Sequence, residues 1–202
     1  MSMIHIEGLS KSFGSNLVFQ DIHVDIEKGD CISVIGPSGC GKSTYAESRM
    51  LSYSLPRVYV ATMIPCGEDA ARRIARHRQL RAGKGFETLE EGVDVGGLPL
   101  PEGASVLLEC LGNLVANEMF EPDGAGENAE ERCLDGIRSL ARRAANLVIV
   151  TNEVGSDGRE YGEGTERYMQ IMGRLGCRIA EMADEVCEVV CGQPVWLKGG
   201  RA

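Results

Sequence analysis

A phosphate-binding pattern occupies residues 36–43 of this 202-residue chain. Gly36, Gly41, Lys42 and Ser43 complete the motif G-x-x-x-x-G-K-[ST], directly after a predicted strand and before a predicted helix. In such a loop the backbone N–H groups turn toward phosphate oxygens, and the helix N-terminus adds positive potential. We expect Lys42 to neutralise the outer phosphates of a nucleoside triphosphate and the Ser43 hydroxyl to ligate Mg²⁺.

The alternative for this pattern is a glycine turn that matches by chance, and the flanking strand and helix disfavour it. The expected loop residues are Gly36, Pro37, Ser38, Gly39, Cys40, Gly41, Lys42, Ser43 and Thr44.

A histidine stands among arginines in the stretch "ARRIARHRQLR", residues 71–81, of an otherwise acidic protein. On a helix Arg73, His77 and Arg81 share one face, because they are spaced i, i+4 and i+8. Guanidinium groups bind phosphates through paired donors, and nearby positive charge disfavours the imidazolium form of a histidine. A neutral His77 in these surroundings suits nucleophilic attack on a nucleotide α-phosphate. From composition alone, a solvated basic helix face that carries a chance histidine is the commoner outcome.

Polar residues also follow two predicted strands at their carboxyl ends. Glu109 ends "SVLLE", at the edge where open α/β sheets gather their ligands, and a carboxylate there suits Mg²⁺ or a ribose hydroxyl. A solvated glutamate at a strand end is an equally good explanation. Asn152 and Glu153 follow the strand that ends at Thr151, and they fit either the same cleft or a structural cap.

The elements that must position these residues alternate between short apolar runs and helical patterns. The expected strands are residues 31–36, 57–62, 105–110, 147–151 and 184–190, with a short edge strand in "QPVWLKGGRA". The expected helices are residues 42–51, 68–81, 111–120, 129–145 and 165–183. This alternation predicts an α/β protein with a mainly parallel sheet and helices on both faces, a P-loop NTPase fold of the RecA-like type.

Composition excludes several classes of protein. The net charge of −9 disfavours a nucleic-acid binder, and no apolar run approaches the length that crosses a bilayer, so we expect neither nucleic-acid nor membrane partners. The N-terminus has no basic start followed by an apolar core, which predicts a cytoplasmic protein. The eight cysteines form no C-x-x-C pair, so reduced thiols are expected rather than a zinc site.

Two family resemblances meet at the phosphate loop. Residues 3–44, with "LSKSFG" and "DIHVDIEKGD" before the loop, resemble the start of an ABC transporter ATPase. That resemblance places Phe13 where the family stacks an aromatic ring on adenine. Downstream the chain has no "LSGGQ" signature, no glutamine loop, no apolar strand ending in Asp-Glu and no switch histidine.

From the loop to "WLKG" near the C-terminus, the chain resembles the bifunctional adenosylcobinamide kinase / adenosylcobinamide-phosphate guanylyltransferase family of cobalamin biosynthesis. The similar pieces occur in the family's order: "GKSTYAE", "YVATM", "RIARHRQLR", "KGFETLEE", "LLECLGNLVANEMF", "LVIVTNEVGSDG" and "ADEVCEVVCGQPVWLKG". The resemblance implies that ATP or GTP phosphorylates adenosylcobinamide, and that GTP then gives its GMP group to adenosylcobinamide phosphate. It also implies a small homo-oligomer.

The resemblance also implies roles for individual residues. His77 matches the histidine that carries the guanylyl group, which reverses the preference for a chance histidine. The implied nucleotide-binding residues outside the loop are Ala61, Thr62, Met63, Arg78, Gln79, Leu80, Arg81, Glu90 and Glu109.

We therefore expect one P-loop nucleotide-binding domain over residues 1–202, with an ABC-like extension at 1–30 and a kinase/guanylyltransferase-like body at 31–202. The extension is expected either to form a small hairpin over the sheet edge or to displace the family's own packing. An ABC transporter ATP-binding subunit and an inactive nucleotide-binding fusion product are the alternative functions.

Overall fold

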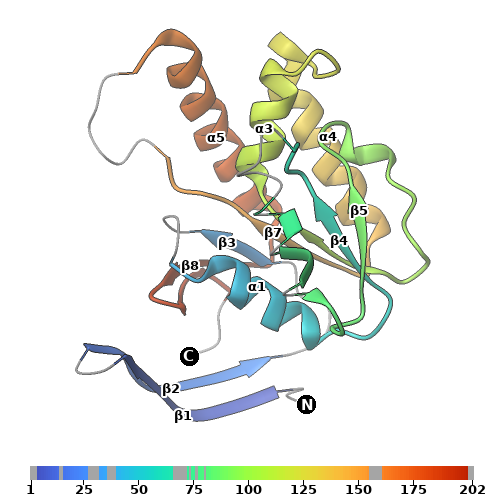
Figure 1. Ribbon diagram of the computed structural model, residues 1–202. Helices are drawn as coiled ribbons and strands as arrows, with labels where there is room; N and C mark the ends of the chain where they lie inside the picture. Colours follow the sequence, from blue (N-terminus) through green and yellow to red (C-terminus); the bar gives the residue numbers. More distant parts are fainter. Residues whose placement is uncertain are drawn as a thin grey trace.

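The computed structural model describes residues 4–13, 16–26, 32–35, 40–65, 72, 74–75, 77–79, 81–154 and 161–199, and of residues 4–35 the backbone alone. Figure 1 shows a layered α/β body with a separate hairpin beside it. The α-helices are α1 (Lys42–Leu51), α3 (Leu111–Phe120), α4 (Ala129–Arg143) and α5 (Glu163–Met182), with 3-10 turns η1 (Val95–Gly97) and η2 (Gly126–Asn128). Residues 72, 74–75, 77–79 and 81 are also helical and are called the His77 helix below.

Seven strands form one sheet in the order β5-β4-β6-β7-β3-β8-β9. The strands are β3 (Ile32–Ile35), β4 (Arg57–Ala61), β5 (Phe86–Glu90), β6 (Ser105–Leu108), β7 (Asn146–Val150), β8 (Glu185–Val190) and β9 (Gln193–Lys198). The first six strands in this order, from β5 through to β8, pair in parallel with their neighbours. The last strand of the sheet, β9, pairs antiparallel with β8. The carboxyl ends of six strands therefore meet at one edge.

The direction of each crossover decides which face of the sheet a helix covers. The chain moves one way along the sheet from β3 to β4 to β5, and the opposite way from β5 to β6, β7 and β8. Because parallel crossovers are right-handed, the two directions place their connections on opposite faces. As a result α1 and the His77 helix lie on one face, and α3, α4 and α5 cover the other (Figure 1).

Alternating strand residues fill a separate core on each face. Val58, Val106 and Leu147 belong to the large cluster beneath α3, α4 and α5, whereas Tyr59 and Leu107 belong to the cluster beneath α1. Strands β4 and β6 therefore carry apolar residues on both of their faces, as expected for a parallel sheet that helices cover on both sides. The prediction of a mainly parallel sheet with helices on both faces is confirmed.

Within the described residues the predicted elements agree with the structure to within a few residues, and β9 is the expected edge strand; the start of the predicted helix 68–81 lies outside the described residues. Strand β5 was not predicted, and its residues "FETLE" are half-buried or exposed. The segments 94–103 and 121–128, for which no element was predicted, contain the short turns η1 and η2.

The N-terminal segment forms its own two-stranded sheet from β1 (Ile4–Phe13) and β2 (Asn16–Ile26). The two strands pair antiparallel, and neither extends the seven-stranded sheet. The described residues of this segment thus form a hairpin, and its position over the sheet edge stays a prediction. We propose that residues 1–30 are an extension and that residues 31–202 are the body of a single nucleotide-binding domain.

A chain shortened to begin at Asp30 tests this division. Because β1 and β2 contribute no strand to the main sheet, we expect its free energy of unfolding in urea to stay within about 1 kcal/mol of that of the full chain. A fall of several kcal/mol, or loss of the cooperative transition, would show that the hairpin is part of the body.

Candidate functional site

The last residues of the phosphate loop, Cys40 and Gly41, pack against Gly192 in the β8–β9 turn. Gly41 has φ +97°, a left-handed conformation that favours glycine, and an added Cβ would lie 2.9 Å from the Gly192 Cα. The Gly192 N–H donates a 2.7 Å hydrogen bond to the Cys40 carbonyl. This contact fixes the chain just before Lys42, the first residue of α1. The predicted loop residues 36–39 lie outside the described residues.

The first turn of α1 presents the side chains that the motif requires. Lys42 is 6% exposed, and its Nζ lies 3.8 Å from the Cys40 Sγ. Ser43 and Thr44 are exposed beside it. An ammonium group and a hydroxyl are thus adjacent at the start of the helix, where its positive end faces the carboxyl edge of the sheet.

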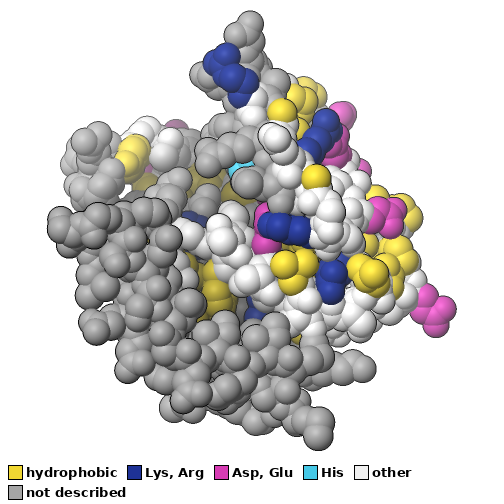
Figure 2. Space-filling view, turned by 60° about the horizontal axis from the view of Figure 1, so that its bottom comes forward, with side chains coloured by type: hydrophobic (Ala, Val, Ile, Leu, Met, Phe, Trp, Pro, Cys, Tyr) yellow, Lys and Arg dark blue, Asp and Glu magenta, His cyan; other side chains and the backbone are white. Residues whose placement is uncertain are grey.

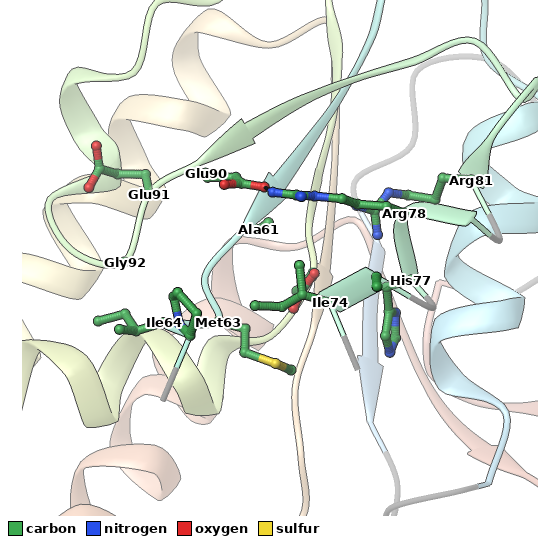
Figure 3. A pocket seen from close by; sticks show the side chains of 13 residues that line it. Ala61, Met63, Ile64, Ile74, His77, Arg78, Arg81, Glu90, Glu91 and Gly92 are labelled. Carbon is green, nitrogen blue, oxygen red and sulfur yellow. Dashed lines mark hydrogen bonds and ion pairs between the residues drawn. The ribbon is translucent and has the colours of Figure 1, made fainter. Parts of the chain in front are cut away.

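A second feature of this edge is a cavity of about 400 Å³. It lies where β4, β5 and β6 end, under the His77 helix (Figure 3). The lining residues that the sequence predicted are Ala61, Met63, His77, Arg78, Arg81, Glu90 and Glu109. Residues from four separate segments thus converge, because parallel strands bring their carboxyl ends to one edge.

The cavity has a charged side and an apolar side. In Figure 3 the side chains of Glu90, Arg78 and Arg81 lie in one row, and the imidazole of His77 points away from that row. Apolar side chains from Met63, Ile64, Pro65 and Ile74 complete the lining. This combination suits a ligand with an anionic part and a flat apolar part, which is the character of a nucleotide.

Arg81 is the buried cation of the cavity. It is 6% exposed, and its Nε and Nη1 atoms are buried without a hydrogen-bond partner in the described part of the chain. Its guanidinium carbon lies 3.5 Å from the centre of the Tyr59 ring. Because a buried charge without a partner is costly, these two N–H groups are suited to an anion that enters the cavity.

Arg78 is used differently from Arg81. It forms an ion pair with Glu90, and both side chains are more than half exposed. Gln79 is also exposed, while Leu80 lies outside the described residues. The predicted cluster of guanidinium groups around His77 is therefore divided in the described residues, with Arg81 buried in the cavity and Arg78 paired at its rim.

Glu109 follows the last residue of β6 and is half-buried at the cavity wall. Burial is the main cause that raises the pKa of Tyr59, and the Glu109 carboxylate, by its charge and by hydrogen bonding with the Tyr59 hydroxyl, raises that pKa further. The structure thus places Glu109 against a buried phenol instead of leaving it fully in solvent.

The wall between β4 and β5 is held by Thr62, which was expected to bind the nucleotide, and by Asn117, which the sequence did not reveal. Thr62 is fully buried and donates a 3.0 Å hydrogen bond to the Cys110 carbonyl. The Asn117 side-chain amide, on α3, donates to the carbonyls of Thr62 at 2.8 Å and Gly92 at 2.9 Å. One side chain therefore joins the two loops that carry Met63 and Glu90.

Asn152 also has a structural contact, because its amide lies 3.6 Å from the Cys110 Sγ at the start of α3. Of the two explanations offered for Asn152, a structural cap agrees with this contact. Among the described residues, no cluster of His, Cys, Asp and Glu side chains has the geometry of a metal site.

The phosphate-loop helix and the His77 helix are tied to each other. Glu47, on α1, forms a 2.6 Å ion pair with Lys84, three residues after Arg81. Arg57 donates hydrogen bonds to the Lys84 carbonyl and to the carbonyl of Tyr53, just beyond α1. These contacts fix the end of the His77 helix relative to α1 on one face of the sheet.

The molecular surface carries its basic residues as scattered groups. Figure 2 shows separate Lys and Arg side chains on this face, not one continuous patch. In the part of the chain that the structure describes, no helix is both long enough and apolar enough to span a bilayer.

Comparison with known proteins identifies the family of the chain. Residues 32–197 match the family described as cobinamide kinase / cobinamide phosphate guanyltransferase. A bifunctional adenosylcobalamin biosynthesis protein of Salmonella typhimurium is 32% identical over 182 residues, covering 83% of this chain and 99% of that protein. Its counterpart in Pseudomonas aeruginosa is 30% identical over 169 residues, covering 82% and 96%.

The ABC-like segment also has relatives. The ATP-binding protein of a lipoprotein-releasing system of Bacteroides fragilis is 52% identical over 42 residues, which are 21% of this chain and 19% of that protein. This similarity is high but short, whereas the family match extends over most of the chain. The chain belongs to the cobinamide kinase / cobinamide phosphate guanyltransferase family, a family of enzymes with a kinase and a nucleotidyltransferase activity in adenosylcobalamin biosynthesis.

Proposed function

We propose that this chain carries out both reactions of its family on adenosylcobinamide, with one triphosphate site at the carboxyl edge of the sheet. The observation that supports this most strongly is the cavity that is lined both by His77 and by Arg81, whose Nε and Nη1 are buried without a partner in the described residues. A nucleophile and an anion-binding cation in one cavity are the two parts that transfer of a nucleotidyl group needs.

In the kinase reaction, the terminal phosphoryl group of ATP or GTP passes to the aminopropanol hydroxyl of adenosylcobinamide. Lys42, buried at the start of α1, stabilises the negative charge that develops on the transferring group. The exposed Ser43 hydroxyl beside Lys42 is a hard oxygen donor, which fits Mg²⁺. Ser43 would hold Mg²⁺, which would supply positive charge beside the phosphates.

In the guanylyl reaction, an imidazole nitrogen of a neutral His77 attacks the α-phosphorus of GTP, and the bond to the pyrophosphate breaks. Arg81 donates its free N–H groups to the phosphate oxygens while charge accumulates. The phosphate of adenosylcobinamide phosphate then attacks the guanylyl-histidine. The bond between the His77 nitrogen and phosphorus breaks, so His77 returns to the neutral imidazole that it was before its attack, and adenosylcobinamide-GDP is the product.

The two parts of the site lie on neighbouring stretches of the same edge. Strands β6 and β7 separate β4 from β3, so at a strand spacing of about 4.8 Å the loop and the cavity are about 14 Å apart. We propose that the nucleotide lies along this edge, with its outer phosphates at α1 and its α-phosphate and base toward the cavity. A small homo-oligomer remains a prediction from the family, and the molar mass in solution tests it.

The proposed nucleophile can be tested by covalent labelling. Incubation of the full chain with GTP labelled at the α-phosphate should give a bond that is labile in acid and stable in base, as expected for a phosphoramidate. His77→Ala should remove the label and still phosphorylate adenosylcobinamide, because the kinase reaction does not use the imidazole.

His5→Ala and His23→Ala are matched controls, since both residues belong to the N-terminal hairpin, and they should keep the label. Labelling that persists in His77→Ala would exclude this residue as the nucleophile.

A second test asks whether both reactions use one triphosphate site. Because Lys42 neutralises the outer phosphates in either reaction, Lys42→Ala should reduce both phosphorylation and labelling by about 10²- to 10³-fold. Initial rates measured with γ-labelled ATP and α-labelled GTP give the two values. If Lys42→Ala lost only the kinase reaction, the guanylyl group would have to come from a separate nucleotide site.

A further inference from the structure

Tyr59 connects the two charged groups of the cavity. It is 2% exposed in the middle of β4, and its ring faces the α1 side of the sheet, opposite to its neighbours Val58 and Val60. The Phe86 ring packs edge-on against it, with ring centres 6.1 Å apart and planes at 83°. Packing on β4 and β5 therefore fixes the orientation of the Tyr59 ring.

The ring of Tyr59 supports the guanidinium group of Arg81. The guanidinium carbon lies 3.5 Å from the ring centre, which is close contact over the face of the ring. A guanidinium group that is held by one face keeps its N–H bonds free at its periphery. This agrees with the unpaired Nε and Nη1 atoms of Arg81.

The other end of Tyr59 meets Glu109. The phenol hydroxyl interacts with the Glu109 carboxylate, which lies at the cavity wall. Arg81 and Glu109 line the same cavity with opposite charges, yet within the described part of the chain no ion pair joins them. In a partly buried site such charges attract strongly, so an intervening group is needed to keep them apart.

We propose that Tyr59 is a positioning residue for the nucleotide, whose ring holds Arg81 toward the phosphates and whose hydroxyl holds Glu109 apart from Arg81. Both charged groups then stay available to the ligand, Arg81 to a phosphate and Glu109 to a ribose hydroxyl or a cation. This inference rests on the proposed function of the cavity. It adds a residue that touches no reacting atom and acts through two that bind the nucleotide.

A double-mutant cycle on nucleotide affinity tests the inference in the full chain. The probe is α,β-methylene GTP, which cannot transfer its guanylyl group to His77, and its dissociation constant is measured by calorimetry. Tyr59→Leu should weaken binding about 10-fold, because Arg81 loses its support. In the Arg81→Ala background, Tyr59→Leu should cause no further loss, and equal losses in both backgrounds would overturn the inference.

Tyr53→Leu is the matched control, since Tyr53 is equally buried in the same cluster, whereas Arg81 stacks on the ring of Tyr59. It should bind the probe within twofold of the wild-type chain, and a 10-fold loss in this variant would show that any lost buried ring has the same effect. Tyr59→Phe keeps the ring but releases Glu109, which can then pair with Arg81, so both the affinity for the probe and the rate of His77 labelling should fall about fivefold. A Tyr59→Phe chain with wild-type labelling would contradict the role of the hydroxyl.

If Tyr59→Leu does not fold, Arg81→Lys gives the same test from the other partner. It keeps the charge but loses the flat group that stacks on the ring, so a 10-fold weaker affinity is expected and an unchanged affinity would overturn the inference. Covalent labelling of the wild-type chain tests the proposed function separately. If the wild-type chain is labelled and Tyr59→Leu binds the probe with unchanged affinity, the proposed function is supported and only the proposed role of Tyr59 is rejected.

Discussion

The burial of the Arg81 guanidinium without a hydrogen-bonding partner is the interaction on which the rest of the site depends. Its position over the Tyr59 ring supplies some electrostatic stabilisation, but two N–H groups stay unpaired in the described structure. Such an arrangement costs free energy in the empty protein and is offset when an anion binds. An unpaired buried cation beside a histidine is therefore a stronger indication of phosphate chemistry than the number of arginines in the sequence.

The topology of the sheet explains why this cation and the phosphate loop lie along one edge of the sheet. Both crossovers that leave β3 and β4 run in the same direction along the sheet, so α1 and the His77 helix cover the same face. All six parallel strands end at one edge, where the loop and the cavity both open. The Glu47–Lys84 ion pair then links the two helices directly. The placement of the His77 helix on the same face as α1 follows from the order and direction of the strands.

Much of this arrangement was predictable from local patterns, because the phosphate loop, the buried strands and the helix with His77 each have a short-range signature. The edge strand β5 was not predicted because it has no continuous apolar run. Such a run is required only in a strand that is buried on both faces of the sheet. Asn117 escaped because its two acceptors, the carbonyls of Thr62 and Gly92, are 55 and 25 residues away. Tyr59 looked like an ordinary strand residue, and its role emerges only when the fold brings Arg81 and Glu109 to its two ends.

The central claim is that one triphosphate reaches from the start of α1 to the imidazole of His77. A crystal structure of the chain with α,β-methylene GTP and Mg²⁺ measures this directly. We expect the outer phosphates at Lys42, and the α-phosphorus within about 3.5 Å of a His77 ring nitrogen, with Arg81 donating to the same phosphate. A nucleotide held entirely at the loop, with the cavity empty and His77 remaining far from the α-phosphorus, would contradict it.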